Sequence, residues 1–532
     1  MTHHGPLGAS SRWLIVLVVT AACLPYLPTI DDYFLQDDFG VVQLLVQRPW
    51  TMFPRWFMMP WMEDIWAYTP DEIRPFVAFT YQLTGKVTPG RPELHHIFNI
   101  AMHAANAVLV MAVARAALGL SAHAAAFAAV VFAVLPVQAE SVAWITGRVD
   151  SMPTLFYLAT FLAYVRWRRD GGRGLYAWSL ALFVVALFSK QNTITMGATL
   201  AAYDLLVLDA ARRRSMVACI AAWTPFAVLT IAFLLLRQAL FGSAVRGGVA
   251  SQEALEAFIA MAGRHFQHVT LGHTAAVKGW ETAAAVAIAV AIGAAAWRSA
   301  RFRRLFICFG VLWWVIGVAP SAVAGYESPR HVYLASIAWA FSLALLLETG
   351  WQAAVQYRPA RRLLIGAAAA IVVLYVIRLV PVVQTWQTLA AIAESGGQRV
   401  IQEARDAPPG TLLLVRLPTK SWEWAAPFAI APPFAEPGLT EKVRLVTPQA
   451  LHCCGEAHWN AYTREQIRAW WNAPDQPPLV ALHVRDGTGA VSRLTDADNP
   501  DLRAFAGVFL ETDSPAALNR AITDLLEGVV RR

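Results

Sequence analysis

The 532-residue chain is 57% hydrophobic and only 15% charged, and its mean hydropathy is +0.45. A water-soluble domain does not need so large an apolar share to fill its core, so the composition indicates an integral membrane protein. The net charge of +7 comes mostly from arginines in short loops. It therefore indicates membrane topology and contact with anionic lipid, and it argues against nucleic acid as a partner.

Apolar runs of roughly 17 to 22 residues, the length of a helix that crosses about 30 Å of hydrocarbon, recur along the chain. This pattern predicts an all-α polytopic membrane domain of about eleven transmembrane helices over residues 1–383. The first run lacks an Ala-x-Ala cleavage site, so we expect it to be retained. The runs begin near Trp13, Ile97, Ala122, Met152, Leu175, Ile194, Val217, Thr282, Leu305, Val332 and Leu363.

Arginine clusters set the expected orientation of these spans. They lie at 166–173, 212–214, 298–304 and 358–362, whereas the alternate short connections carry only Arg148, Lys190 and Arg330. Because cytoplasmic loops are enriched in Lys and Arg, the clusters should be cytoplasmic. The N-terminus is then inside, and the tail beyond residue 383 lies in the periplasm or another extracytoplasmic compartment. The localisation predicted is a multi-pass inner or plasma membrane protein.

The first outside loop, 31–92, contains the adjacent carboxylates Asp37 and Asp38 just before an expected helix, Phe39 to Leu45. Acids cap a helix N-terminus in many proteins, which is the structural interpretation. Two adjacent carboxylates near an interface of low dielectric also raise the proton affinity of one of them, which prepares a general base. Asp31 and Asp32 could do the same, but we expect them to be solvated. The aromatic stretch Trp50 to Trp61 suits short interfacial helices.

A polar stripe, His96, Asn99, His103 and Asn106, has spacings that place all four on one face of the second span. Interhelical hydrogen bonding is the favoured interpretation. The two histidines are seven residues apart, about 10 Å along a helix, which is too far for one metal ion. No metal site is predicted here.

Charged residues recur at the outside ends of later spans. Any one of them could be a snorkelling anchor, but cations are disfavoured on that side, so several at one level call for an anionic partner. A lipid-linked phosphate fits, since Arg and Lys donate charge-assisted hydrogen bonds to its oxygens. The residues are Glu140, Arg148, Asp150, Lys190, Arg237, Glu327 and Arg330.

The tail, 384–532, has the pattern of a small α/β domain. It begins with an expected helix, Leu389 to Arg405, followed by a strand, Thr411 to Leu417. Leu479 to Leu494 suits a hairpin that turns at Asp486-Gly487, and a final helix should follow Ser514. Cys453 and Cys454 are adjacent, a spacing that bridges only with strain, so we expect two thiols there.

Several segments resemble the GT-C superfamily of membrane glycosyltransferases that use polyprenyl-phosphate sugars, and most of all the TMTC and PMT type of protein O-mannosyltransferases and their bacterial relatives. The similarity runs in order over roughly residues 30 to 340. The segments are Gln36-Asp37-Asp38-Phe39, Arg74-Pro75 through His96 to Asn106, Leu135 to Asp150, Leu187 to Gln191 with Tyr203-Asp204, and Glu327 to Ser336.

The resemblance implies roles for individual residues. Asp37 or Asp38 would be the catalytic acid of the first loop, and Lys190, Arg330 and Arg148 would bind the donor phosphate. Arg74, His96, Asn99, His103, Glu140, Asp150 and Glu327 would support the site. Gln191 stands where the family often has Glu, and an extra residue separates Glu327 from Arg330. A divalent metal assists some members of the superfamily, and no tetratricopeptide array follows the spans.

The expected function is inverting transfer of a monosaccharide from a polyprenyl-phosphate donor to an acceptor hydroxyl of protein, glycan or lipid, on the outer face of the membrane. The acceptor and the sugar stay open. One alternative is a flippase or transporter of polyprenyl-linked glycans, although transporters tend to place charges at mid-membrane. Another is a non-catalytic membrane assembly protein, which leaves the loop acids unexplained.

Overall fold

The structure is a computed structural model in which the chain packs as two compact units. The first unit combines Met1–Thr29 with His96–Gln384, and the second combines Ile30–His95 with Thr385–Arg532. The second unit therefore joins the loop 31–92 to the tail, a grouping that does not follow a single cut at residue 383. The residues described are 9–63, 72–208, 215–245, 252–272, 279–323, 328–418, 420–447, 468–469, 471–485, 488–497, 499, 501–511, 520–521 and 523–525.

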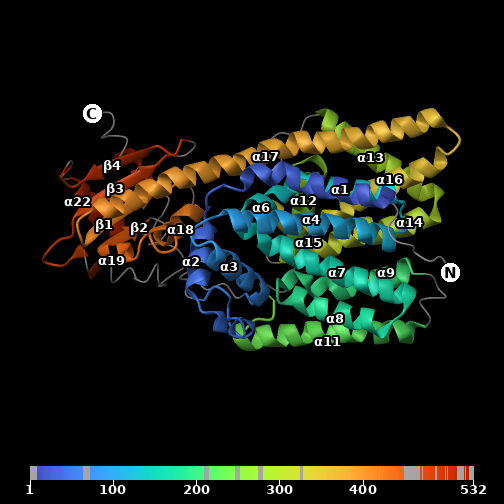
Figure 1. Ribbon diagram of the computed structural model, residues 1–532, viewed down its shortest axis with the longest axis horizontal. Coiled ribbons are helices and arrows are strands. Elements are labelled where there is room, and N and C mark those ends of the chain that lie inside the picture. Colours follow the sequence, from blue (N-terminus) through green and yellow to red (C-terminus); the bar gives the residue numbers. More distant parts are fainter. Residues whose placement is uncertain are drawn as a thin grey trace. The chain divides into compact units, whose positions relative to one another are not determined.

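The first unit is built from helices, coloured from blue to yellow in Figure 1. Short 3-10 turns separate several of them, among them η6 (Gln191–Thr195) and η8 (Pro329–Val332). The helices are α1 (Ala9–Cys23), α4 (Glu93–Ala116), α5 (Ala122–Val134), α6 (Ala139–Ala143), α7 (Arg148–Asp170), α8 (Arg173–Leu187), α9 (Met196–Leu206), α11 (Met216–Phe241), α12 (Gln252–Leu271), α13 (Gly279–Arg298), α14 (Ala300–Phe306), α15 (Trp313–Val323), α16 (Ile337–Ala353) and the part of α17 (Arg358–Asp406) up to Gln384.

Local chemistry explains where these helices end. Gly171 and Gly172 adopt φ of 79° and 96° between α7 and α8, conformations that only glycine reaches without strain. The chain reverses there, and α7 and α8 lie side by side (Figure 1). Ser215 caps α11 by accepting the Ala218 amide at 3.2 Å, and Gly242 ends it in the left-handed conformation.

Five helices of the described chain are long and apolar enough to cross a membrane, and the count is six if a helix pair bent by 55° is one span. They include α4, α11 and α17, and the bent pair is α5 with Pro136–Ala143. Arg173–Leu187 and Val286–Arg298 are shorter apolar helices. The general prediction of a helical membrane protein is thus confirmed. The count of eleven spans stays a prediction.

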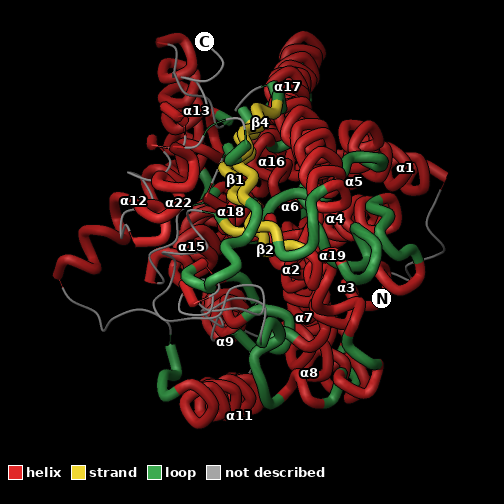
Figure 2. Tube along the Cα trace, turned by 90° about the vertical axis from the view of Figure 1, so that its left-hand side faces the viewer, coloured by secondary structure: helices red, strands yellow, loops and turns green. Residues whose placement is uncertain are grey.

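The second unit contains a four-stranded sheet in the order β2-β1-β3-β4. β1 (Thr411–Arg416) is parallel to β2 (Val443–Val446) and to β3 (Leu479–Val484), and β3 is antiparallel to β4 (Val491–Thr495). Figure 2 shows the strands in yellow. β1 and β3 are apolar and buried along nearly their whole length, as expected of central strands covered on both faces. The small sheet, the strand at 411 and the hairpin pairing are confirmed.

Helices accompany this sheet. They are α18 (Lys420–Ala429), α19 (Leu439–Lys442) and α22 (Asp501–Glu511), which the sequence did not predict. The expected helix start at Leu389 is wrong, because α17 runs unbroken from Arg358 to Asp406 with Pro381 inside it. A proline removes one backbone donor, which a long membrane helix can tolerate. Asp486-Gly487, Cys453-Cys454 and most of the final predicted helix lie outside the described residues.

The loop 31–92 also supplies helices to the second unit. They are α2 (Asp37–Gln47), α3 (Pro75–Val87) and the short 3-10 helices Trp50–Met52 and Arg55–Phe57. Phe34 and Phe39 pack edge-on against Phe434, with ring centroids 4.8 and 5.0 Å away. Gln47 donates to the Pro432 carbonyl at 3.3 Å. Aromatic contacts between residues distant in sequence thus hold the loop against the segment that follows α18.

Candidate functional site

Asp150, in the first turn of α7, lies between two cations of the first unit. Nζ of Lys190 donates a hydrogen bond to Oδ1 of Asp150, and Nε of Arg330 lies 3.8 Å from Oδ2. The Asp150 side chain is only 3% exposed, whereas those of Lys190 and Arg330 are 12% and 22% exposed. The carboxylate fixes both cations, and both keep part of their surface accessible to a ligand.

Each member of this group stands at the end of a helical segment. Lys190 follows α8 in an extended conformation and precedes η6 (Gln191–Thr195), and Arg330 lies on η8 (Pro329–Val332). An acid in the first turn of a helix, as Asp150 is, interacts favourably with the helix dipole. Three chain segments that are remote in sequence therefore bring their charged ends together.

Glu140, on α6, holds η8 in place. Oγ of Ser328 donates to both Glu140 oxygens at 2.6 and 2.7 Å, and the Arg330 amide donates to Oε2 at 3.2 Å. Nε of Arg330 lies 3.8 Å from Oε1, and its guanidinium carbon lies 4.8 Å from the centre of the Trp144 ring, a cation–π distance. The guanidinium of Arg330 is thus positioned by two carboxylates and one indole.

Arg148 lies deeper than the other cations. It is fully buried, its Nε donates to Oδ1 of Asn99 at 2.9 Å, and its guanidinium lies 4.9 Å from the Phe98 ring. Asn99 in turn donates to the carbonyls of Trp144 at 3.0 Å and Ile145 at 3.2 Å. This network ties α4 to the turn before α7.

Gly147 allows that turn to close on α6. A β-carbon at this position would lie 2.3 Å from the Glu140 carbonyl oxygen and 2.7 Å from Cα of Ser141. Both are backbone atoms that cannot rotate away. Glycine therefore permits the close approach that places Glu140 and Arg148 on adjoining segments.

The polar stripe of α4 makes the interhelical hydrogen bonds predicted for it. Nδ1 of His103 lies 2.7 Å from the Tyr333 hydroxyl, and Asn106 donates to the Ser151 carbonyl at 2.9 Å. His96 is buried as well. In the part of the chain that the structure describes, no three His, Cys, Asp or Glu side chains gather closely enough to hold a metal ion.

His331 adds a titratable group that sequence reasoning did not single out. Burial and the nearby Lys190 charge lower the pKa of His331 to about 3, although Asp150 opposes the shift. Its imidazole is therefore neutral at physiological pH and adds no positive charge to the site. Ser328 and Trp144 were also missed. Their only sequence signal is their position beside Arg330 and Arg148 in the family-like segments.

Asp37 and Asp38 belong to the second unit and differ in their surroundings. Asp38 is buried, and its Oδ2 accepts the Leu35 amide at 2.9 Å while the Leu35 carbonyl accepts the Asp38 amide at 2.8 Å. Asp37 is half-buried. Gln36, just before it, has φ of 49°, a strained conformation for a residue with a side chain. Asp38 thus fixes the turn at the start of α2 through its two hydrogen bonds with Leu35. Asp37 is the less buried of the two acids.

Other candidates from the loop have structural partners. Arg74 is paired with Glu72 at 2.7 Å and lies 5.7 Å from the Trp61 ring. Asp32 is half-buried, which corrects the expectation that it is solvated. Burial and the charge of Asp31 raise the pKa of Asp32 to about 6. Glu327 lies outside the described residues.

Solved structures share the fold over nearly the whole chain. ArnT from Cupriavidus metallidurans, bound to undecaprenyl phosphate, superposes with a TM-score of 0.52 at 14% identity, covering 90% of this chain and 94% of that one. The Archaeoglobus fulgidus oligosaccharyltransferase, in complex with Zn and sulfate, gives 0.51 at 13% identity and covers 89% and 68%. This is the GT-C fold. The GT-C fold that the sequence resemblance implied is confirmed.

Curated proteins that match part of this sequence are named protein O-mannosyl-transferases. Human protein O-mannosyl-transferase TMTC4 is 29% identical over 37% of this chain, and mouse TMTC3 is 30% identical over 36%. The matches span 30% and 21% of those proteins, so the chain corresponds to less than a third of the length of either. No protein-family model matches the chain.

Proposed function

We propose that this GT-C protein is an inverting glycosyltransferase that moves a monosaccharide from a polyprenyl-phosphate donor to an acceptor hydroxyl on the outer face of the membrane. The observation that carries the proposal is Asp150 held between Lys190 and Arg330. With Arg148 and Glu140 included, the group has three cations and two carboxylates, a net charge of +1. Such a site favours an anion, and phosphate is the anion of this donor class.

Lys190 and Arg330 would bind the donor phosphate, because both are partly exposed. Arg148 is fully buried and would shape the site through Asn99. As the glycosidic carbon–oxygen bond to phosphate breaks, negative charge grows on the leaving polyprenyl phosphate, and the two cations would stabilise it. No reduction or oxidation occurs, and the sugar simply exchanges one oxygen substituent for another.

Asp37 would act as the general base. It would take the proton of the acceptor hydroxyl as that oxygen attacks the anomeric carbon from the face opposite the phosphate, which inverts the configuration. Asp38 accepts a backbone amide and would hold the turn. Mannose is the first sugar to test, because the matched relatives are named O-mannosyl-transferases.

The test uses the full chain, purified in lipid nanodiscs. It is supplied with radiolabelled mannosyl-phosphoryl-polyprenol or the glucosyl analogue, together with a mixed pool of peptide, glycan and lipid hydroxyl acceptors. Release of polyprenyl phosphate that depends on the protein supports the transferase. A flippase would instead move the intact donor across a vesicle membrane without cleaving it. Absence of cleavage with either donor, in protein that is shown to bind it, would overturn the proposal.

A further inference from the structure

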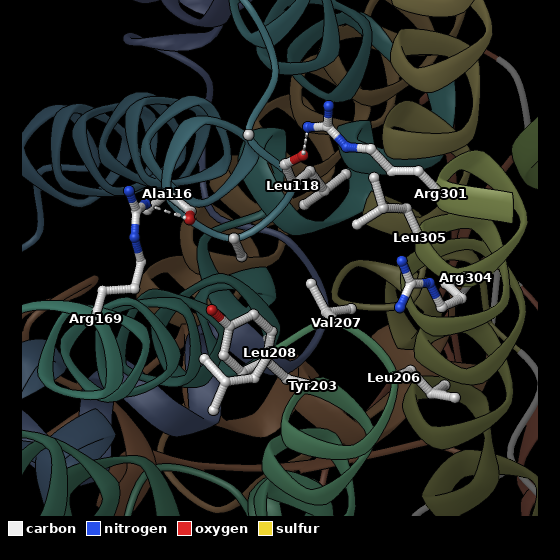
Figure 3. A pocket seen from close by; sticks show the side chains of 12 residues that line it. Ala116, Leu118, Arg169, Tyr203, Leu206, Val207, Leu208, Arg301, Arg304 and Leu305 are labelled. Atoms are coloured by element: carbon white, nitrogen blue, oxygen red, sulfur yellow. Dashed lines mark hydrogen bonds between the residues drawn. The ribbon is translucent and has the colours of Figure 1, made fainter. Parts of the chain in front are cut away.

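The first unit contains a second basic site, formed by Arg169 at the end of α7 and by Arg301 and Arg304 on α14 (Figure 3). These side chains line a cavity of about 350 Å³. Its other walls come from the end of α4 and from the end of α9. All these segments belong to the first unit.

Two of the arginines are anchored by main-chain carbonyls. Arg169 donates to the Ala116 carbonyl at 2.6 Å, and Arg301 donates to the Leu118 carbonyl at 3.5 Å. Each anchor uses one of the five N–H donors of a guanidinium. Arg304 points toward the same space in Figure 3. Within the described residues, none of the three pairs with a carboxylate, so the cavity carries three positive charges.

The cavity also has an apolar side. Leu118, Leu208 and Leu305 are buried beneath it, and Tyr203 is buried beside them. A fully hydrated anion gains nothing from contact with such an apolar wall. A phosphate ester carries both a charge and an apolar substituent that can contact it. Basic pockets between membrane helices on the cytoplasmic side bind phospholipid head groups in this way.

This cavity is separate from the Asp150 site. Asp150 and Arg169 stand near opposite ends of α7, which runs from Arg148 to Asp170. At 1.5 Å per residue they are roughly 30 Å apart along the helix axis, about the thickness of the hydrocarbon core. One phosphate cannot occupy both, and the cavity lies among the arginine clusters expected to be cytoplasmic.

We propose that Arg169, Arg301 and Arg304 form a binding site for a phosphate group, carried by an anionic phospholipid of the inner leaflet. The guanidiniums bind the phosphate oxygens, and the leucine wall contacts the glycerol and the first acyl carbons. The proposal does not depend on the glycosyltransferase assignment, because its readout is lipid binding.

The test compares Arg304→Gln with Arg303→Gln in the full-length protein. Both residues are exposed arginines of the same helix, but Arg303 does not line the cavity. Native mass spectrometry after titration with phosphatidylglycerol gives the dissociation constant, and phosphatidylcholine serves as the neutral lipid. Losing a charged hydrogen bond should raise the constant by on the order of tenfold in Arg304→Gln, more in Arg301→Gln/Arg304→Gln, and little in Arg303→Gln.

Inorganic phosphate forms the second arm, measured by the shift in thermal unfolding temperature. One outcome is that phosphate raises the unfolding temperature saturably, that Arg304→Gln removes this rise, and that phosphatidylglycerol binds no better than phosphatidylcholine. This outcome would overturn the lipid proposal and assign the site to a soluble phosphate ester. Equal binding of both lipids together with no effect of phosphate would overturn the proposal. So would equal losses in Arg303→Gln and Arg304→Gln.

Discussion

Oδ1 of Asp150 accepts a hydrogen bond from Nζ of Lys190, a residue 40 positions further along the chain. Oδ2 of the same carboxylate faces Arg330 at 3.8 Å. A single acid therefore fixes the spacing of two cations that come from different chain segments, Lys190 before η6 and Arg330 on η8. Its removal should affect stability and ligand binding in different ways, which makes the arrangement testable.

Asp150→Asn keeps the side-chain volume but leaves Lys190 and Arg330 without their shared counter-charge. Breaking a buried pair in this way should destabilise the fold by about 3 kcal/mol and lower the apparent Tm. Adding Lys190→Met should restore part of the loss. Glu436→Gln is the matched control, because its pair with Arg405 is exposed and should matter little. An unchanged Tm in Asp150→Asn would contradict a structural role for the carboxylate.

Lys190→Ala and Arg330→Ala should each weaken use of the lipid donor by about 1.5 to 3 kcal/mol, the value of a charged hydrogen bond. Kinetics at varied donor concentration measure this, and Arg405→Ala supplies a control that loses the same charge from an exposed pair. If both variants fold and keep parental donor kinetics, the phosphate does not bind at these residues.

The two loop acids should respond differently to substitution. Asp37→Asn should abolish sugar transfer and leave donor binding intact, because the amide cannot accept the proton. Asp38→Asn keeps an oxygen for the Leu35 amide and should retain most activity, whereas Asp38→Ala should cost about 1 kcal/mol of stability. Transfer assays and thermal unfolding separate these effects. Near-parental activity in Asp37→Asn would show that Asp37 is not the general base.

The pKa of Asp32, raised to about 6 by burial and by Asp31, predicts a pH dependence of stability. The folded state holds the proton more tightly than the unfolded state, so Asp32 stabilises the fold at low pH and loses this contribution as pH rises from about 4 through about 6. Compared with Asp32→Asn, the parent should lose Tm over that window. Asp31→Asn should move the midpoint to lower pH. Parallel Tm curves for parent and Asp32→Asn would refute the shift.

Reporter fusions test the orientation. Fusions within 166–173 and 298–304 should read as cytoplasmic, and a fusion after Arg532 should read as exported, because the arginine clusters favour the inside. Fusions at 166–173 and after Arg532 that report the same compartment would mean that the predicted number of spans is off by one.

Sequence alone located the charged residues of the site but not their partners. Lys190 and Arg330 stood out because cations are unusual at span ends that are predicted to lie outside, and Asp150 stood out as a charge at the same predicted level. The contact of the two cations with one shared carboxylate depends on how α7, α8 and η8 pack. Ser328 carried no signal of its own, since a serine in a loop has many uses. The stripe on α4 was predictable because its spacing follows the helical period.

Hydrophobic periodicity in the sequence predicted less of the fold, because it does not report long-range packing. The sequence predicted a separate helix beginning at Leu389, but α17 runs unbroken from Arg358 to Asp406. The packing of Phe34 and Phe39 against Phe434 joins residues about 400 positions apart, and no local pattern reports such a contact. The sequence therefore divided the chain in linear order, whereas the first loop packs with the tail.

The length of α7 has an evolutionary consequence. The helix carries Asp150 near its first residue and Arg169 near its last, and both must keep their direction toward different neighbours. One inserted residue would turn everything beyond it by about 100° and advance it by 1.5 Å. Insertions and deletions in this helix should therefore be rare in related sequences even where the identities of its lipid-facing residues drift freely.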